Sequence, residues 1–213
     1  MNRYLQIDNY FSLVTQALDK IDRHSISAFV DMVLRTSGSK ANVYVFGNGG
    51  SGATASHICG DFAKGVSYGS DRKLKAICLN DNTPVLTALA NDVSYDDIFV
   101  EQIKNLLKPD DLVVGISGSG NSINVVKALE YANSIGAATV AFCGFCGGKI
   151  KQIASLAVHA EINNMEIVED LHMIIAHCVK NIIITEFKAG TPHHHAERQL
   201  SLASINKNAA AQK

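Results

Sequence analysis

The sequence carries almost no net charge, because its 19 lysines and arginines nearly balance its 20 aspartates and glutamates. Without a basic field, a nucleic-acid-binding surface is not indicated. No apolar run approaches the roughly 18–20 residues of a membrane-spanning helix. The residues after Met1 lead into an amphipathic stretch with three aspartates, and not into the apolar core of a signal peptide. We therefore expect no nucleic-acid or membrane partner, and a small, polar, soluble molecule as ligand.

The five cysteines are an odd number and lie mostly within apolar segments, which is typical of a reduced, cytoplasmic protein. A chain of 213 residues, 47% of them hydrophobic, is long enough to bury the core of one domain. From about Lys188 the composition turns polar and rich in alanine, asparagine and lysine. We predict one domain over residues 1–187 and a mobile tail over 188–213. Three consecutive histidines in that tail, at 193–195, are more typical of solvated residues than of a metal site.

Hydrophobic periodicity predicts an α/β fold. Apolar positions at helical spacing indicate a pair of N-terminal helices, over residues 5–22 and from Ser25 onward. Short runs rich in valine and isoleucine then indicate five buried strands, at 42–46, 74–79, 111–116, 137–143 and 155–160. Helical segments alternate with them, at 51–65, 84–107 with a break near Asn91-Asp92, 121–135, 147–153 and 165–187. This alternation predicts a five-stranded parallel sheet with helices on both faces.

Two glycine- and serine-rich loops follow the first and third predicted strands. Their sequences are Gly47-Asn48-Gly49-Gly50-Ser51 and Ser117-Gly118-Ser119-Gly120-Asn121-Ser122. Glycine lets the backbone approach a ligand, serine hydroxyls and free N–H groups then point at it, and a helix N-terminus adds partial positive charge. Ligands of parallel sheets bind at the carboxyl ends of the strands, where both loops fall. We predict one phosphate site built from both loops.

The first loop also matches the dinucleotide-binding pattern G-x-G-x-x-G over residues 47–52. That pattern requires an acidic residue at the end of the next strand, about 20 residues later. Here the strand ends at Asn80-Asp81, which is late, and a dinucleotide would leave the second loop without a function. Nucleotide binding therefore stays the alternative to a phosphate site.

Titratable residues gather on two predicted helices. His57 and Asp61 are four residues apart and share a face, as do Glu169 and His177, which are eight apart. Three interpretations are open. A buried histidine–carboxylate pair, with His172 among the candidates, could satisfy itself by hydrogen bonding. A carboxylate and an imidazole could act as general base and acid. A divalent metal, best zinc, could be held by the mixed N/O set of His57, Asp61, Glu169 and His177.

A C-x-x-C motif, Cys143-Gly144-Phe145-Cys146, follows the fourth predicted strand. A redox dithiol needs this motif at the start of a helix. The Gly147-Gly148 pair that comes next delays the helix start to about Lys149, which disfavours redox chemistry.

The order of these features resembles that of the sugar isomerase (SIS) fold, and within it the phosphoheptose isomerases. The resemblance covers about residues 5–187 and rests on the two loops, His57, Asn91-Asp92, the segment Glu169-Asp170-Leu171-His172 and His177. It implies a flavodoxin-like parallel sheet and a homotetramer whose neighbouring subunits complete each active site. It also implies isomerisation of sedoheptulose 7-phosphate to D-glycero-D-manno-heptose 7-phosphate in the cytoplasm, with zinc in several members.

The resemblance also implies residue roles. Ser51, Ser117, Ser119 and Ser122, with Gly49, Gly50 and Gly118, would bind the phosphate end, while Asn48 and Asp92 would bind sugar hydroxyls. The active-site glutamate of the family falls on Asp61, and its catalytic, metal-binding histidine on His177. Its glutamine ligand falls on Glu169, and an aspartate of its substrate site falls on Glu166.

Two of these positions depart from the family pattern. Asp61 is one methylene shorter than glutamate, and a shift of about 1 Å at a reacting group costs on the order of 100-fold in rate. Glu169 adds a negative charge where the family has glutamine, but four possible metal ligands remain, which favours a zinc-containing subgroup. The reaction would pass through a cis-enediol. Asp61 would move a proton between neighbouring carbons, and His177 would protonate or deprotonate the ring or carbonyl oxygen of the sugar. A non-catalytic SIS-domain sensor of sugar phosphates, a regulator that binds the DnaA replication initiator, and an isomerase of another phosphosugar are the alternatives.

Overall fold

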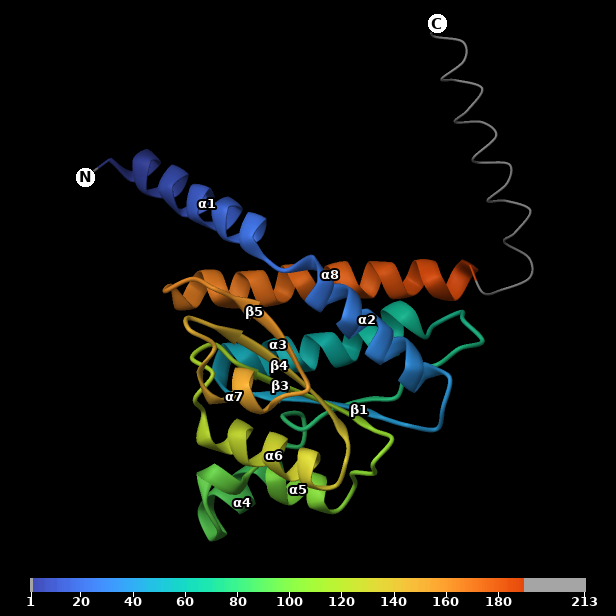
Figure 1. The fold of residues 1–213 in the computed structure, drawn as a ribbon. Coiled ribbons are helices and arrows are strands. Elements are labelled where there is room, and N and C mark those ends of the chain that lie inside the picture. The colour runs from blue at the N-terminus through green and yellow to red at the C-terminus, as the bar shows by residue number, and fades with distance from the viewer. Residues whose placement is uncertain (1, 190–213) are drawn as a thin grey trace, which may run out of the picture.

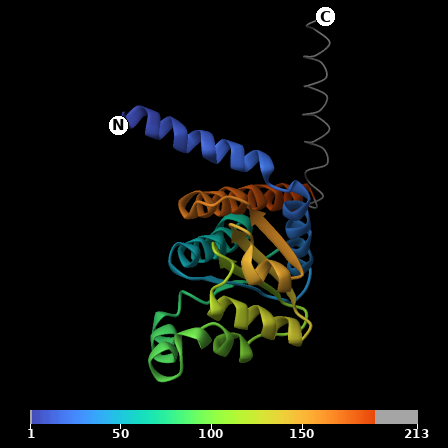
Figure 2. The same ribbon diagram turned by 60° about the vertical axis from the view of Figure 1, so that its left-hand side comes forward.

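The computed structural model describes residues 2–189, which form one α/β unit with a long N-terminal helix that stands away from it (Figures 1 and 2). The helices are α1 (Arg3–Lys20), α2 (Arg23–Ser37), α3 (Gly49–Gly60), α4 (Thr83–Asp92), α5 (Val100–Lys104), α6 (Ile123–Ser134), α7 (Gly148–Ile153) and α8 (Met165–Ala189). A π-helical turn, η1 (Asp61–Val66), continues α3, and a 3-10 turn, η2 (Tyr95–Asp97), lies between α4 and α5.

The five strands form one parallel sheet. They are β1 (Val43–Gly47), β2 (Ala76–Cys78), β3 (Leu112–Ser117), β4 (Ala138–Gly144) and β5 (Leu156–Ala160), in the order β2-β1-β3-β4-β5. This is the flavodoxin-like order, in which the chain reverses its direction of growth between β1 and β3. Gly47 pairs in register with Ile116, so β1 and β3 end beside each other. The predicted fold class is confirmed, and the two loops meet at this edge of the sheet.

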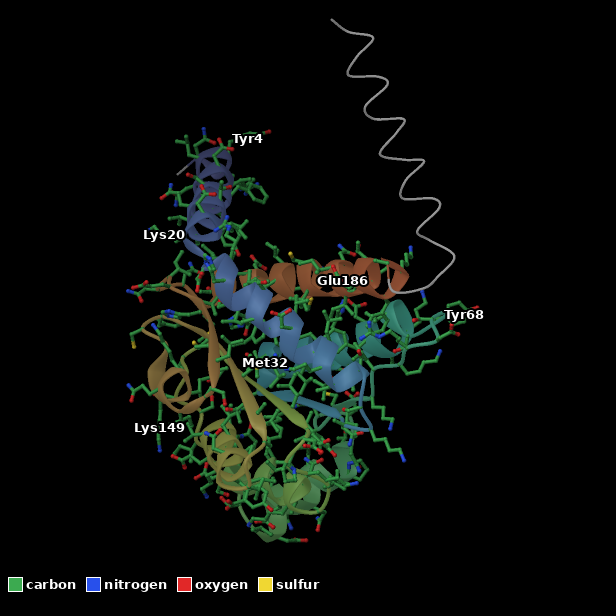
Figure 3. All side chains as sticks on the ribbon, turned by 45° about the vertical axis from the view of Figure 1, so that its right-hand side comes forward. Tyr4, Lys20, Met32, Tyr68, Lys149 and Glu186 are labelled. Carbon is green, nitrogen blue, oxygen red and sulfur yellow. The ribbon has the colours of Figure 1, made fainter. Side chains whose placement is uncertain are left out.

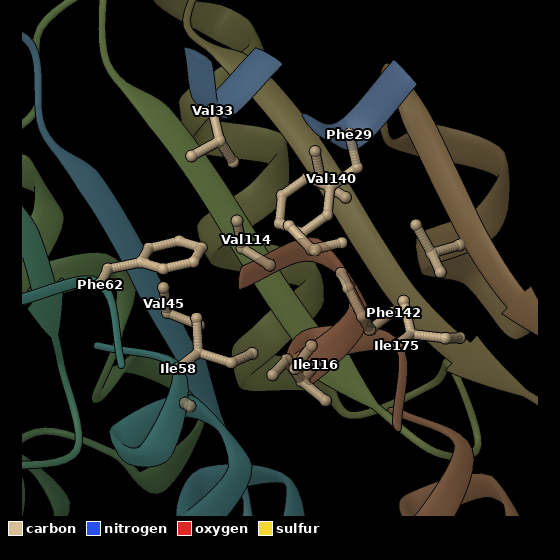
Figure 4. Close-up of a cluster of buried hydrophobic side chains, with 14 of the residues drawn as sticks. Phe29, Val33, Val45, Ile58, Phe62, Val114, Ile116, Val140, Phe142 and Ile175 are labelled. Carbon is tan, nitrogen blue, oxygen red and sulfur yellow. The ribbon is translucent and has the colours of Figure 1, made fainter. Parts of the chain in front are cut away.

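Alternate strand residues enter two separate cores. Val45, Val114 and Phe142 face α2, α3 and α8, whereas Tyr44, Val113 and Ala141 face the layer that contains α5, α6 and α7. Figure 4 shows the first core, where Phe29 of α2 meets Phe142 of β4 edge to face, with ring centroids 5.3 Å apart. Strands that are buried on both faces explain why the sequence shows continuous apolar runs there instead of an alternating pattern.

The caps of several helices follow from single polar side chains. Asn2 accepts a hydrogen bond from the Tyr4 amide at the start of α1, and Asp22 accepts one from the His24 amide at the start of α2. Asn164 accepts one from the Ile167 amide and so starts α8. Side-chain oxygens at these positions satisfy donors that a helix N-terminus leaves unpaired.

The structure differs from the sequence prediction in three elements. The predicted strand at 74–79 is paired only over Ala76–Cys78. The break predicted near Asn91-Asp92 is confirmed, because α4 ends at Asp92, but the part of the predicted 84–107 helix after the break is only η2 and the short α5. The helix predicted to span 51–65 ends at Gly60 and continues as the π-helical turn η1. Ser67 stabilises that turn, because its amide and its hydroxyl both donate to the carbonyl of Phe62, five residues earlier.

Helix α8 extends to Ala189, so it includes the first two residues of the predicted tail. The rest of that tail, including the histidines at 193–195, lies outside the described residues. Among residues 2–189, no helix combines the length and the apolar composition that crossing a membrane requires.

Candidate active site

The two serine-rich loops enclose a cavity of about 260 Å³ at the carboxyl edge of β1 and β3. Most of the residues that were predicted to bind the phosphate end contribute to its wall. The lining residues are Asn48, Gly49, Gly50, Ser51, Ile116, Ser117, Gly118, Ser119, Ser122, Met165 and Glu169. The topology therefore brings together two loops that are about 70 residues apart in the sequence.

Both helices that start at this cavity lack a capping side chain at the residue that precedes them. Asn48 precedes α3 and Ser122 precedes α6, but neither side chain makes a capping hydrogen bond to its own helix. The Ser122 hydroxyl instead lies 3.0 Å from the Ser117 hydroxyl, across the second loop. In the first turn of α6 the Val125 amide donates to Asn124 Oδ1. The uncapped N–H groups before it and those at the start of α3, with serine hydroxyls beside them, form a site that suits an anion.

The amide of Asn48 is largely engaged within the protein. Its Nδ2 donates to Asn124 Oδ1 at 2.9 Å, and its Oδ1 accepts from Asn124 Nδ2 and from the Tyr95 hydroxyl, both at 3.0 Å. One N–H of Asn48 remains for a ligand, because an amide nitrogen has two protons to donate. Sequence reasoning missed Asn124 of α6 and Tyr95 of η2, which orient Asn48.

Glu169 of α8 forms the other wall of the cavity and lies directly against α3. A Cβ atom added at Gly50 would lie 2.5 Å from Glu169 Oε1, so a larger residue there would require the carboxylate to move. Met165 lies in the same way against Gly118 of the second loop. The glycines of both loops therefore let α8 approach the start of α3 and the end of β3.

Farther along α3 and α8, two imidazoles and a carboxylate converge. The Nε2 atoms of His57 and His177 are 2.9 Å apart, and Asp61 Oδ2 lies 3.5 Å from the first and 3.8 Å from the second. Each imidazole is 47% exposed, whereas the Asp61 side chain is only 16% exposed. Sequence spacing predicted His57 beside Asp61. His177, which the sequence analysis grouped with them as a possible metal ligand, is 120 residues away from His57, and the packing of α8 on α3 brings it to the pair.

Lys180 fixes the orientation of Asp61. Its Nζ donates to Asp61 Oδ1 at 2.6 Å, while Asp61 Oδ2 is buried and has no hydrogen-bond partner within the part of the chain that the structure describes. The stem of Lys180 crosses Gly65 in η1, where an added Cβ would lie 2.6 Å from Lys180 Cε. Sequence reasoning missed Lys180, although its position three residues after His177 places both on one face of α8.

The donor set of this triad fits a divalent metal. Two ligands of tetrahedral zinc, each about 2.0–2.1 Å from the ion, are roughly 3.3 Å apart. The three separations in the triad, 2.9, 3.5 and 3.8 Å, scatter around that value. The unpaired buried Asp61 Oδ2 supplies a reason for a cation, because a buried carboxylate oxygen is costly without a partner. His57, Asp61 and His177 could therefore hold a metal.

Three of the predicted site residues do not join these two groups as expected. Glu169 was predicted as a fourth metal ligand, but its carboxylate lies at the cavity end of α8, eight residues or about 12 Å of helix before His177. Asp92 and Glu166 do not line the cavity either. Asp92 is an exposed residue at the end of α4, where it accepts from Asn91, and Glu166 is exposed in the first turn of α8.

His172 behaves as a core residue. It is 1% exposed, its Nε2 lies 3.3 Å from the carbonyl oxygen of Cys143, and its ring meets Phe142 edge to face. Burial lowers the pKa of His172 to about 4, so the imidazole is neutral. Its partner is a backbone carbonyl and not a carboxylate, and its buried Nδ1 has no hydrogen-bond partner among residues 2–189, so the predicted histidine–carboxylate pair does not form here.

The C-x-x-C motif lacks the features of a redox dithiol. Burial raises the pKa of the Cys143 thiol to about 12, whereas a reactive thiol has a lowered pKa. Helix α7 begins only at Gly148, after the motif, and all five cysteines are free.

Comparison with known proteins agrees with this geometry. The family model of the SIS domain matches residues 9–144. A probable phosphoheptose isomerase of Thermoplasma volcanium is 36% identical over 182 residues, which cover 85% of this chain and 92% of the relative. This chain belongs to the SIS domain family, among the phosphoheptose isomerases. It is accordingly an enzyme of the isomerase class.

Other members of the family extend the likeness. A phosphoheptose isomerase of Aquifex aeolicus is 38% identical over 141 residues, which cover 66% of this chain and 73% of the relative. The solved structure of a phosphoheptose isomerase from Neisseria gonorrhoeae superposes with a TM-score of 0.80 at 25% identity. That match covers 86% of this chain and 100% of the other.

Proposed function

We propose that this SIS-domain isomerase interconverts the ketose and aldose forms of a sugar phosphate, with sedoheptulose 7-phosphate and D-glycero-D-manno-heptose 7-phosphate as the pair. The observation that carries the proposal is the unpaired Asp61 Oδ2 beside two imidazoles, on the same pair of helices whose other end forms an anion cavity. We choose a heptose phosphate as the substrate because relatives of this chain are phosphoheptose isomerases.

The distance between the two groups supports a substrate that reaches both. Six residues separate Ser51 from His57 on α3, which is about 9 Å along the helix. The six carbon–carbon bonds of an extended heptose, about 1.5 Å each, span roughly 7–8 Å, and the phosphate adds to this length. A phosphate held by Ser51, Ser117, Ser119 and Ser122 would thus place the far end of the sugar at the triad.

The residues of the triad can divide the proton transfers of ketose–aldose exchange. Asp61 Oδ2 would take a proton from the carbon beside the carbonyl and return it to the neighbouring carbon, through a cis-enediol. His177 would exchange a proton with the sugar oxygen. Lys180, which holds Asp61 Oδ1, keeps the other oxygen directed at the substrate. Binding of the remote phosphate would position the reacting carbons.

We propose zinc as the cofactor, with His57, Asp61 and His177 as its ligands from this chain. When bound, zinc would supply positive charge that polarises a sugar oxygen. The proposal rests on the unpaired Asp61 Oδ2 and on separations that suit tetrahedral coordination. Glu169 would contribute to the substrate cavity, whose wall it forms.

We also propose that the protein is a homo-oligomer in which α1 packs against other copies, as expected for a tetramer with shared active sites. Helix α1 stands away from the body and exposes Tyr4, Leu5 and Phe11 to 77%, 66% and 64% (Figure 3). A cluster of large apolar side chains on one projecting helix is typical of an interaction surface. The five free cysteines support the predicted cytoplasmic location, and residues 1–187 are proposed as a single SIS domain.

The proposal is tested by incubating metal-analysed protein with sedoheptulose 7-phosphate and following the sugar by NMR, with and without added zinc. We expect aldoheptose 7-phosphate signals whose rate of appearance depends on zinc. Conversion of a pentose or hexose phosphate in place of the heptose would change the proposed substrate, but the proposed class of reaction would stay the same. Binding of sugar phosphate without any conversion would overturn the proposal in favour of a sensor.

A further inference from the structure

The second serine loop, residues 117–122, rests on another loop that the proposed reaction does not use. This supporting loop, residues 144–148, contains the end of the C-x-x-C motif and the two glycines after it. The Gly144 amide donates to the Gly118 carbonyl at 2.8 Å, and the Lys149 amide just beyond the loop donates to Asn121 Oδ1 at 3.0 Å. The backbone of one loop is therefore held by the backbone that follows β4.

The two loops are in contact without intervening side chains. A Cβ at Gly120 would overlap the carbonyl of Gly147, and a Cβ at Gly148 would lie 2.6 Å from the Gly120 oxygen. The Ile150 amide also donates to that same Gly120 oxygen, at 3.0 Å. A change in the path of residues 144–148 must consequently move residues 118–121, because no side chain lies between them to absorb it.

The supporting loop has one strained position. Phe145 adopts φ +50°, and it is the only non-glycine residue with positive φ among residues 2–189. A bulky side chain in this conformation is costly and persists only when its surroundings hold it. Two contacts hold Phe145 in this conformation: its amide donates to the Ile162 carbonyl at 3.3 Å, and its carbonyl oxygen lies 2.9 Å from His159 Nε2.

Lys151 determines which nitrogen of His159 carries the proton. Its Nζ lies 3.0 Å from His159 Nδ1, and an ammonium group can only donate. Nδ1 must therefore accept, so Nε2 carries the proton and donates it to the Phe145 carbonyl oxygen. The stem of Lys151 also crosses Gly147, where an added Cβ would overlap Lys151 Cδ. His159 is paired with Cys143 across β4 and β5, which fixes its backbone at the base of the supporting loop.

We propose that His159 is a positioning residue for phosphate binding: through the carbonyl of Phe145 it keeps residues 144–148 in the shape against which residues 117–122 form the anion site. The inference rests on the proposed function, because it gives the second serine loop the role of binding phosphate. His159 itself contacts neither the cavity nor the triad in this arrangement, since it does not line the first and is absent from the second.

The test compares His159→Leu, which removes both hydrogen bonds, with His159→Gln, whose amide can still donate to Phe145. We would measure the affinity for inorganic phosphate by calorimetry, the KM and kcat for sedoheptulose 7-phosphate, and the melting temperature. His159→Leu should weaken phosphate binding and raise KM by about three- to tenfold, the usual effect of one hydrogen bond, with kcat within about twofold. His159→Gln should restore most of the affinity.

A second variant separates positioning from general damage to the fold. Adding Phe145→Gly to His159→Leu should recover most of the phosphate affinity, because glycine adopts positive φ without strain. The same exchange at the fully exposed His24 is the matched control, and it should change none of these quantities. A lower melting temperature in His159→Leu with unchanged phosphate affinity and KM would overturn the inference.

The calorimetric arm keeps this inference distinct from the proposed reaction. Wild-type protein that binds inorganic phosphate but converts no sugar would contradict the isomerase proposal and leave the role of His159 testable by binding alone. Wild-type protein that isomerises normally, together with a His159→Leu variant of unaltered affinity, would contradict only the role of His159.

Discussion

Replacing Asp61 with asparagine should abolish turnover while leaving phosphate binding intact. Lys180 can only donate, so it will keep the oxygen of the new amide at the place of Asp61 Oδ1. The NH₂ group then occupies the place of Oδ2, facing His57 and His177. A group that donates there can neither take a proton from the substrate nor ligate a metal, because it has no lone pair to offer. The variant thus removes both proposed functions of Oδ2, as base and as metal ligand, and keeps the hydrogen bond between Lys180 and the other oxygen.

The expected loss in kcat is about 10²–10⁴-fold, the usual contribution of one general base. The fold should tolerate the change, because Lys180 retains an acceptor. We expect a cost of about 1 kcal/mol from the weakened charge-assisted bond. For a domain of this size, that corresponds to a decrease of roughly 2–4 °C in melting temperature.

Three measurements check this prediction: kcat by NMR with sedoheptulose 7-phosphate, bound zinc by elemental analysis, and inorganic phosphate affinity by calorimetry. Zinc content should fall, while phosphate affinity should stay within about twofold, because the serine loops lie at the other end of α3. Glu101→Gln, which alters a surface ion pair with Lys104, is the control and should retain wild-type values. A normal kcat in Asp61→Asn would refute the assignment of this carboxylate as the base.

Three further predictions follow from individual contacts. Gly50→Ala should displace the Glu169 carboxylate, lower the stability by about 1–3 kcal/mol and raise KM. Gly60→Ala in the same helix, where an added Cβ meets nothing within 4 Å, should have neither effect, and denaturant unfolding and kinetics check both variants. His172, with a pKa of about 4 in the fold and 6.5 when unfolded, is protonated first in the unfolded chain, so stability falls as pH drops through this window. Between pH 7 and pH 5, wild-type protein should lose about 2 kcal/mol more than His172→Leu, and equal losses in urea titrations would exclude this origin. Phe11→Glu should reduce the mass measured by sedimentation velocity, while Asn9→Glu on the other side of α1 should leave it unchanged.

The fold could be predicted because its signals are local. Valine- and isoleucine-rich runs predicted all five strands, and the turn residues after β1 and β3 predicted where the loops fall. The parallel arrangement then placed both loops at one edge without any knowledge of side-chain contacts. The lengths of β2 and of the helix after the break near Asn91-Asp92 were wrong, because they depend on which neighbours offer hydrogen bonds, and residue type does not encode this.

Within the triad, residue spacing alone predicts proximity only across a single helical turn. His57 and Asp61 are four residues apart, and their side chains do meet, at 3.5 Å. Glu169 and His177 are eight apart and also share a face, but two turns separate them by about 12 Å, so a shared face does not make a shared site. What brings His177 to His57 is the parallel packing of α3 on α8, in a register where Gly50 meets Glu169 and Gly65 meets Lys180. That register depends on which positions lack a Cβ. The two glycines leave the space that the Glu169 carboxylate and the Lys180 side chain occupy, and a side chain at either position would require these groups to move.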